Sequence, residues 1–340
     1  MARKIRLSDI AAQAGVSTAT VSRVLNGKDS VAPETRQAVI AALDLLGYER
    51  PEVLRERSGG QIGIIVPELT NPVFPLFTQQ IANAMTVQGF TPLLGTQMAG
   101  GATEDAYVEA MISQRVAGFA FISGLHADST ANTARYERIS ELGIPFITIN
   151  GANPALANPD FSADDASAVR QSIRHLVTLG HTKIGLASGP IRFFPSRDKT
   201  EAYLDTMREL LPYEKPRVIH TLYTLSGGQF AASQLIGAGC TAIICGSDLM
   251  ALGVVRRCRS MGLQVPQDVS VIGYDDTPFT SFTDPPLTTL RQPVKTMTEA
   301  AVSTLLAMIG GAPADVGKMK FEPELIVRES TSRHHDSARH

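Results

Sequence analysis

The sequence predicts a small all-α head followed by an α/β body of two doubly wound, parallel-sheet subdomains. In residues 1–48, apolar side chains recur at helical spacing. Beyond residue 61, short β-rich apolar runs alternate with amphipathic helical stretches, which is typical of parallel sheets covered on both faces. A chain of 340 residues with 44% hydrophobic content is long enough for about two to three domains with sizeable cores.

The first predicted element is a pair of helices within Leu7–Asn26. Its apolar residues fall at helical spacing on either side of a short turn, Gly15-Val16-Ser17. Gly15 can adopt the left-handed conformation that ends one helix, and Ser17 can cap the next by accepting a hydrogen bond from a free backbone N–H. So short a turn requires the helices to pack at a steep angle, as in a helix-turn-helix.

The second helix of this pair presents a polar face suited to reading DNA. Small side chains let a helix approach base edges closely, and an arginine can hydrogen-bond guanine in two places. The predicted DNA-contacting residues on this face are Ser17, Thr18, Ala19, Thr20, Ser22, Arg23 and Asn26. An ordinary surface helical hairpin is the alternative interpretation of the same pattern.

A third helix is predicted to begin at Pro33 and to end at Gly47. Proline at a first helical position with an acidic residue behind it favours a helix start. One apolar stripe follows, made of Val39, Ile40, Leu43 and Leu46. Up to Ile40, six basic residues stand against three acidic ones, whereas the whole chain has a formal net charge of −2. This asymmetry suits a head that faces phosphates on a neutral-to-acidic body.

Four motifs in a fixed order make the chain similar to the lactose/galactose-repressor (LacI/GalR) family of bacterial transcription regulators. They are IRLSDIAAQAGVSTATVSRVLNG (5–27), RHLVTLGHTKIGLASGP (174–190), SDLMALGVVRRCRSMGLQVPQDVSVIGYDDTP (247–278) and PPLTTLRQPV (285–294). These motifs are spread over residues 5–294, so the resemblance extends over nearly the whole chain, and together they are far more specific than any one motif. The resemblance implies a DNA-binding transcriptional regulator, in most cases a repressor, in which a small-molecule effector binds between two lobes.

The resemblance also implies partners and a mode of control. A homodimer would place two heads on a palindromic operator with half-sites about one helical turn apart. An effector, a sugar or a nucleoside-like molecule, would shift one lobe relative to the other and change DNA affinity. Inducer and corepressor logic both remain open. Only a short polar tail follows the last predicted strand, so we expect a dimer rather than a tetramer.

The segment 49–61, ERPEVLRERSGGQ, is the predicted linker between head and body. It is charged, contains Pro51 and ends in a glycine pair. In the family, this segment forms a hinge helix whose leucine wedges into the minor groove. Leu54 is the candidate wedge, although it comes earlier than the family pattern places it. A solvated charged linker that does not contact the groove is the alternative.

Eight runs in the body read as strands, and they are residues 62–67, 91–96, 118–123, 146–150, 183–188, 218–223, 242–247 and 269–275. An amphipathic helix over Val294–Met308 and a strand over residues 324–330 follow. The resemblance implies that the chain crosses between the lobes. The expected subdomains are then 62–162 with 292–321, and 163–291 with 322–331, and residues 332–340 form a disordered tail. This bilobed body resembles periplasmic sugar-binding proteins.

Polar and aromatic residues lie where ligands bind in such folds, at the carboxyl ends of parallel strands. A carboxylate, a guanidinium, amide and hydroxyl groups, and rings suit a polyhydroxylated ligand. The predicted effector-binding residues are Phe74, Asn150, Arg197, Tyr223, Ser247 and Asp275. We expect Asp248 to be a helix cap and Asp276 a turn residue. Both sugars and nucleosides offer hydroxyl groups, so the two ligand classes stay open.

Other classes of protein fit less well. The sequence lacks a GxGxxG after a strand, GxxxxGK[ST], HExxH and GxSxG, which disfavours an enzyme. A secreted solute-binding protein would explain residues 62–330 but not the head, and MARKIRLSDI has no apolar signal region. The spacing of Cys240, Cys245 and Cys258 is not that of a zinc site, and they read as buried thiols. We therefore expect a cytoplasmic, nucleoid-associated protein without cofactor or metal.

Overall fold

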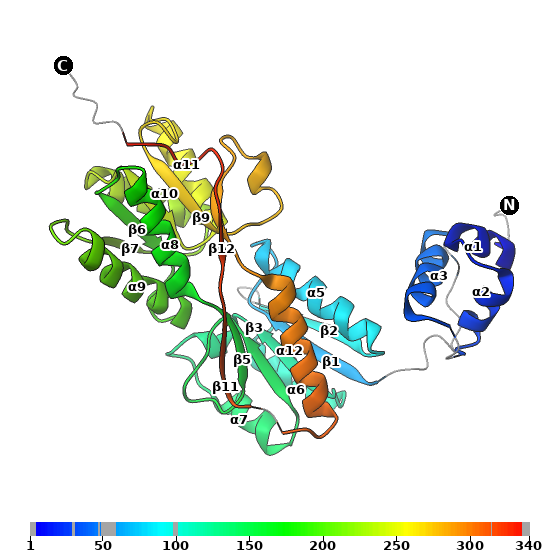
Figure 1. The fold of residues 1–340 in the computed structure, drawn as a ribbon. Coiled ribbons are helices and arrows are strands. Elements are labelled where there is room, and N and C mark those ends of the chain that lie inside the picture. Colours follow the sequence, from blue (N-terminus) through cyan, green and yellow to red (C-terminus); the bar gives the residue numbers. More distant parts are fainter. Residues whose placement is uncertain are drawn as a thin grey trace. The chain divides into compact units, whose positions relative to one another are not determined.

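The computed structural model describes residues 5–28, 31–46, 48, 59–97, 101–313 and 315–334. The chain divides into two compact units, one holding residues up to Gly60 with Gln88–Thr91, the other holding Gln61–Val87 and Pro92–His340 (Figure 1). The predicted wedge Leu54, most of the predicted linker and most of the predicted tail lie outside the described residues. Among the residues that are described, no helix is long and apolar enough to cross a membrane.

The head consists of helices α1 (Leu7–Ala14), α2 (Thr18–Leu25) and α3 (Pro33–Leu46). Gly15 has the left-handed φ of 66°, and the Ser17 hydroxyl accepts a hydrogen bond from the Thr20 backbone N–H at 3.1 Å. Both local predictions for the turn are therefore confirmed. The core between the helices consists of Ile10, Ala11, Val21, Val24, Leu25, Val39, Ala42 and Leu43. Full burial of each larger side chain contributes about 1.5–3 kcal/mol to the free energy of unfolding.

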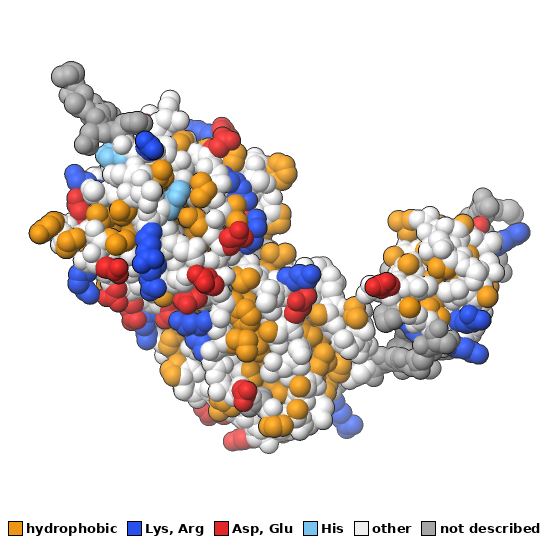
Figure 2. All heavy atoms as spheres, in the orientation of Figure 1, with side chains coloured by type: hydrophobic (Ala, Val, Ile, Leu, Met, Phe, Trp, Pro, Cys, Tyr) orange, Lys and Arg blue, Asp and Glu red, His pale blue; other side chains and the backbone are white. Residues whose placement is uncertain are grey.

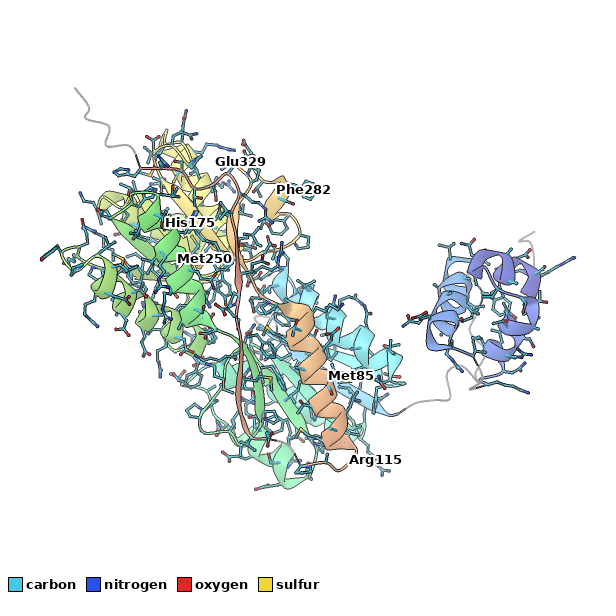
Figure 3. The ribbon with its side chains drawn as sticks, in the orientation of Figure 1. Met85, Arg115, His175, Met250, Phe282 and Glu329 are labelled. Atoms are coloured by element: carbon cyan, nitrogen blue, oxygen red, sulfur yellow. The ribbon has the colours of Figure 1, made fainter. Side chains whose placement is uncertain are left out.

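The first lobe of the body is built on a sheet with strand order β11-β5-β4-β3-β1-β2. Its strands are β1 (Gln61–Val66), β2 (Thr91–Thr96), β3 (Gly118–Ile122), β4 (Phe146–Ile149), β5 (Pro159–Ala163) and β11 (Gly317–Phe321). Its helices are α5 (Val73–Val87), α6 (Glu104–Ser113), α7 (Ala134–Glu141) and α12 (Val294–Ile309), with the short 3-10 turn η1 (Leu125–Ala127) after β3. α12 packs against α5, where Met85 is buried (Figure 3).

The second lobe repeats this arrangement on a sheet with strand order β12-β10-β9-β8-β6-β7. Its strands are β6 (Ile184–Ser188), β7 (Arg217–His220), β8 (Ala242–Cys245), β9 (Ser270–Asp275), β10 (Thr288–Arg291) and β12 (Glu324–Ile326). Its helices are α8 (Asp165–Thr178), α9 (Phe194–Leu210), α10 (Leu225–Gly237) and α11 (Asp248–Ser260), with a 3-10 turn η2 (Thr280–Phe282). β12 pairs with β10 antiparallel, whereas β6 to β10 pair in parallel.

The eight predicted body strands are all present, with ends that differ by a few residues. The run 218–223 is wrong at its C-terminal end, because β7 stops at His220. The strands β5, β10 and β11 were not predicted. The sequence of β5, PDFSA, contains two polar side chains, Asp160 and Ser162, yet all five residues are buried. Because buried polar residues interrupt the apolar run, the sequence pattern does not reveal this strand.

The chain passes from one lobe to the other between β5 and α8, between β10 and α12, and between β11 and β12 (Figure 1). In each sheet the strand order reverses beside the first strand, between β1 and β3 and between β6 and β8. In open α/β sheets the crevice for a ligand lies at such a reversal, outside the carboxyl ends of the strands. The topology therefore predicts a ligand site at the loops after β1, β3, β6 and β8.

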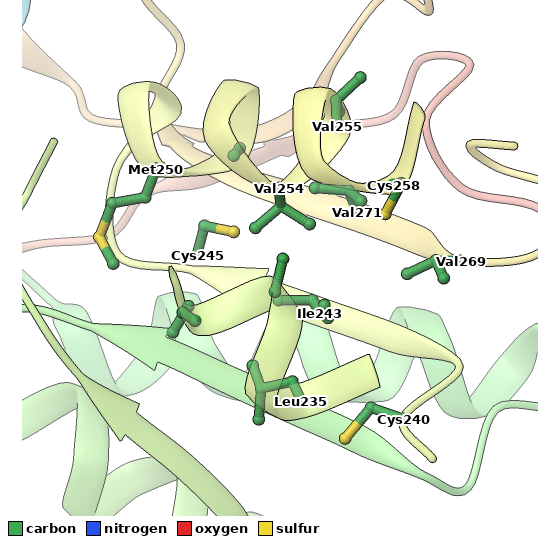
Figure 4. Close-up of a cluster of buried hydrophobic side chains, with 14 of the residues drawn as sticks. Leu235, Cys240, Ile243, Cys245, Met250, Val254, Val255, Cys258, Val269 and Val271 are labelled. Atoms are coloured by element: carbon green, nitrogen blue, oxygen red, sulfur yellow. The ribbon is translucent and has the colours of Figure 1, made fainter. Parts of the chain in front are cut away.

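The three cysteines are free and buried in the second lobe, as predicted. Figure 4 shows Cys240, Cys245 and Cys258 among the aliphatic side chains between α10, α11 and the sheet. Burial raises the pKa of Cys240 to about 11. A thiol that stays protonated is a poor nucleophile and metal ligand, so these residues act as core side chains.

Candidate functional site

The exposed face of α2 carries the residues predicted to read DNA. Ser17, Thr18, Ala19, Arg23 and Asn26 are exposed, while Val21 and Val24 on the opposite face are buried. The other two predicted residues, Thr20 and Ser22, are half-buried. Figure 2 shows Lys and Arg side chains at the surface of this unit. A rigid helix with small residues and an exposed arginine has the shape and charge that major-groove binding requires.

The ends of α2 are held by its own polar side chains. The Ser17 hydroxyl caps the first turn, and the Asn26 amide donates to the Ser22 carbonyl at 2.8 Å. Because these bonds are internal, Ser17 and Asn26 fix the helix as well as facing outward. Arg23 remains the long, exposed base-reading candidate.

The body contains a cavity of about 220 Å³ between its two lobes, at the strand ends that the topology identified. The structure brings five of the six predicted effector residues to its walls, and these are Phe74, Asn150, Tyr223, Ser247 and Asp275. They follow or end β1, β4, β7, β8 and β9, so their position at the carboxyl ends of strands was predictable from the sequence.

Three polar side chains form a chain of hydrogen bonds from one lobe to the other. The Asn150 amide of the first lobe donates to Gln292 Oε1 at 2.9 Å. The Gln292 amide donates to Asp275 Oδ1 at 2.7 Å in the second lobe. Gln292 lies in the segment that connects β10 with α12, so it sits at a crossing between the lobes. A ligand that hydrogen-bonds to any of these groups would compete with a bond that joins the two lobes.

Several cavity residues adopt left-handed backbone conformations that side chains other than glycine rarely take. Ser123, Asn150 and Asp275 have φ values of 46°, 56° and 116°. Each lies at the carboxyl end of a strand and lines the cavity. Such conformations cost about 1–3 kcal/mol each and concentrate at ligand sites, where the surrounding structure holds them. All three strained residues are polar and line the cavity, which is consistent with a ligand site.

The Asp275 carboxyl group is buried, and only 5% of the residue is exposed. Burial raises its pKa well above the ordinary value, the nearby Asp248 carboxylate raises it further, and the hydrogen bond from Gln292 opposes the shift. A buried carboxyl group with one protein partner has unused capacity for a hydrogen bond to a ligand hydroxyl.

Lys199 supplies a cation to the same wall. Its ammonium contacts the Asp165 carboxylate at 2.5 Å and lies 4.0 Å from the centre of the Tyr274 ring. Burial lowers the pKa of Lys199, but the carboxylate of Asp165 opposes burial and the net shift is upward. Tyr274 also donates its hydroxyl to Asp165 at 2.6 Å. The ammonium therefore stays charged and fixed in place.

Aromatic rings from both lobes form the apolar part of the cavity. Phe74 comes from the first turn of α5, and Phe193, Tyr223 and Tyr274 come from the second lobe. The Tyr223 hydroxyl lies 2.7 Å from Ser196 Oγ. A Cβ atom on Gly189 would approach this ring to 2.0 Å, so glycine is needed there to admit the tyrosine. Rings beside fixed polar groups match the flat faces and hydroxyl edges of a sugar.

Arg197 does not line the cavity, contrary to the sequence-based expectation. Its guanidinium donates to the Ser129 hydroxyl at 3.1 Å and stacks near the Phe194 ring. Lys199, two residues further along α9, lines the cavity instead. Residues two apart point to roughly opposite sides of a helix, since each residue turns it by about 100°.

The helix cap after β8 also differs from expectation. Ser247, not Asp248, caps α11, because the Ser247 hydroxyl accepts from the Met250 N–H at 3.3 Å. Asp248 is buried and accepts hydrogen bonds from Thr277 and Thr289. Asp276 lies in the loop after β9, as expected, with a φ of 53°. Asp248 therefore stabilises the end of the sheet rather than the helix start.

A second set of contacts joins the lobes beside the cavity. The Arg192 guanidinium donates to the Asp128 carboxylate at 2.7 Å. Asp128 and Phe193 form an isolated antiparallel bridge, and the Ser129 backbone N–H donates to the Arg192 carbonyl at 2.9 Å. We call the loop segments 128–129 and 192–193 the clasp. It closes the cavity on the side where Ala127 and Phe193 form the wall.

Sequence reasoning missed Lys199, Gln292, Glu68 and Asn71, which all line the cavity. Gln292 belongs to the motif PPLTTLRQPV, but the strand that it follows, β10, was not predicted. Glu68 and Asn71 lie in the loop after β1, close in sequence to Phe74, which was predicted. Among the described residues, no group of His, Cys, Asp and Glu could hold a metal ion.

Comparisons with known proteins agree with this architecture. The model of bacterial regulatory proteins of the lacI family matches residues 6–51, and that of the periplasmic binding protein-like domain matches residues 173–331. The HTH-type transcriptional regulator reg1 of Streptomyces lividans is 55% identical over 333 residues, covering 96% of each chain. The HTH-type transcriptional regulator MalR of Streptomyces coelicolor is 55% identical over 332 residues, again covering 96% of each.

Two solved structures resemble the chain over most of its length. The transcriptional regulator CelR–cellobiose complex has a TM-score of 0.69 at 27% identity and covers 96% of this chain and 100% of its own. The lac repressor dimer bound to operator and the anti-inducer ONPF has a TM-score of 0.71 at 26% identity, covering 97% and 100%.

Proposed function

The chain belongs to the lacI family of bacterial regulatory proteins and is a DNA-binding transcriptional regulator, and we propose that it is a repressor controlled by a sugar or sugar derivative. The proposed effector binds in the cavity between the lobes. The proposed form is a homodimer on a palindromic operator. Its relatives are named as regulators, a function without catalysis.

The observation that carries the sugar proposal is the chemistry of the cavity wall. Asp275 accepts hydroxyl hydrogens, Lys199 donates, and Phe74 with the other rings offers faces for the apolar side of a sugar ring. The residues proposed to contact the effector are Phe74, Asn150, Lys199, Tyr223, Ser247, Asp275 and Gln292. The structural similarity to the transcriptional regulator CelR–cellobiose complex supports a carbohydrate as the class of effector.

The proposed control is linkage between the cavity and the head. An effector that bonds Asp275 and Asn150 favours one arrangement of the lobes, because these residues belong to different lobes and share Gln292. The lobe shift would pass through the linker, residues 49–61, to the head. Coupling free energies of this kind are typically about 1–3 kcal/mol, which is about 5- to 150-fold in DNA affinity.

The proposed DNA complex follows from the head and from the lac repressor relative, a dimer on its operator. Two heads would dock α2 in successive major grooves, with Arg23 reading guanine. Leu54 in the linker is the proposed minor-groove wedge. The proposed division of the chain is a head (1–48), a linker (49–61), two lobes (62–162 with 292–321, and 163–291 with 322–331) and a tail (332–340).

A thermal-shift screen tests the ligand class. Neutral sugars and nucleosides are added to the full chain, and a bound effector raises Tm with its occupancy because it binds only the folded state. We expect a shift with a sugar and none with nucleosides. A shift with nucleosides alone would contradict the sugar proposal, and the absence of any shift would contradict an effector of either class.

A further inference from the structure

The charged side chains that face the cavity are mainly acidic. Glu68, Asp165 and Asp275 contribute carboxyl groups, and Lys199 is the only cation among the described residues that line it. That cation is already paired, since its ammonium contacts Asp165 at 2.5 Å. Even where burial keeps Asp275 protonated, the cavity gains no positive charge. An anionic ligand group would therefore meet no unpaired cation on the wall.

Backbone N–H groups at helix starts are the other common anion site in α/β folds. α5 begins at the cavity, but its first turn offers little to an anion. Asn71 takes two of the free donors, because its side chain accepts from the Val73 N–H at 3.4 Å and its carbonyl from the Phe74 N–H at 3.1 Å. The next residue, Pro75, has no N–H.

The helices of the second lobe that begin at the cavity are occupied in the same way. α8 starts with Asp165, and the preceding Asp164 accepts from the Ser167 N–H at 3.2 Å. α11 is capped by Ser247 and carries an acidic residue in its first turn. α9 has Pro195 in its first turn. Acidic side chains and prolines thus take the positions where a phosphate would bind.

We infer, on the basis of the proposed function, that the effector is an uncharged polyhydroxylated ligand and that the cavity rejects its phosphate ester. A phosphate group carries a charge of about −1.5 to −2 at pH 7 and is held in proteins by Arg, Lys or free N–H groups. Hydroxyl groups both donate and accept, so they fit carboxylates and amides equally well. The regulator would then respond to a sugar before phosphoryl transfer, not to the product of that reaction.

Calorimetry on the full chain with matched pairs of ligands tests this inference. The probes are glucose, ribose, maltose and cellobiose, each beside its terminal phosphate ester, at low ionic strength. We expect at least one neutral sugar to bind and its ester to bind about 100-fold more weakly, because the ester's phosphate would be repelled by the carboxylates that line the cavity. Added salt should narrow the difference, since it screens the repulsion.

Two variants test whether the carboxylates of the cavity wall cause the difference in affinity between a sugar and its phosphate ester. Glu68→Gln keeps the shape of the side chain and removes one carboxylate, so the ratio of the sugar's affinity to the ester's affinity should fall by about fivefold. The control is Glu141→Gln at the exposed end of α7, which should leave the ratio unchanged. An ester that binds as tightly as its sugar overturns the inference alone, as does a ratio unaffected by Glu68→Gln. If no neutral sugar binds, the proposed function fails and the inference with it.

Discussion

Arg192 and Asp128 join the two lobes of the body through an ion pair at 2.7 Å, although they lie 64 positions apart in the sequence. Arg192 is in the loop after β6, and Asp128 follows the 3-10 turn after β3. The neighbouring residues Phe193 and Ala127 line the cavity. The pair thus stabilises the arrangement in which the cavity is covered.

Arg192→Ala should speed effector dissociation without abolishing binding. The side chain is 48% exposed, so solvent screens the pair and its contribution is at most about 1 kcal/mol, or roughly fivefold in rate. Stopped-flow displacement of the bound effector measures this rate. Arg208→Ala is the matched control, because its ion pair with Asp205 lies within α9. Equal dissociation rates in parent and Arg192→Ala would mean that the clasp does not hold the lobes together.

Asp160 gives a prediction about pH. This buried residue of β5 accepts a hydrogen bond from Thr148 at 2.8 Å, and burial raises its pKa from 3.8 to about 6. Because the folded-state pKa is the higher one, Asp160 contributes stability that is full below pH 3.8 and is lost as pH rises through about 6. The loss amounts to about 3 kcal/mol of the free energy of unfolding.

Asp160→Asn should therefore weaken the fall in Tm between pH 4.5 and pH 8, as followed by circular dichroism. Some dependence should remain, since burial also raises the pKa of Asp248 to about 6. Asp205→Asn, at an exposed position of α9, should follow the parent. A parent-like pH dependence in Asp160→Asn would show that this carboxyl group ionises normally.

The local features of the fold were predictable because they depend on neighbouring residues. Gly15 and Ser17 define their turn by backbone and side-chain chemistry alone, Asp275 ends a recognisable strand, and Asn150 follows one. The choice between Arg197 and Lys199 was not predictable, because it depends on how α9 is rotated against the sheet. The bonds of Gln292 to both lobes required the tertiary structure, since no local pattern specifies a partner 142 positions away.

Arg23→Ala should weaken binding to the specific operator by about 1–3 kcal/mol and binding to random DNA much less, because it removes base readout. The operator is obtained by selection from a pool of random duplexes, and fluorescence anisotropy measures both affinities. Lys28→Ala, also exposed on the head, is the comparison for a phosphate contact. If Arg23→Ala weakens binding to the operator and to random DNA equally, Arg23 contacts phosphates and does not read bases.

Leu54→Ala should reduce the bend of the bound operator, because the proposed wedge unstacks a base step. Energy transfer between dyes at the two ends of the duplex reports the bend. Leu45→Ala removes a leucine that is 72% exposed on α3 and should leave the bend unchanged. An unaltered bend in Leu54→Ala would favour the charged-linker alternative.

The central claim, that a ligand at Asp275 controls DNA binding, is tested most directly by titrating effector against operator affinity in the parent and in Asp275→Asn. The variant keeps the shape but leaves a buried ligand hydroxyl poorly paired, which costs about 1–3 kcal/mol. We predict the same operator affinity without effector, and about a tenfold to hundredfold higher effector concentration for the same change. An unchanged effector dependence in Asp275→Asn, or an operator affinity altered before any effector is added, would contradict the claim.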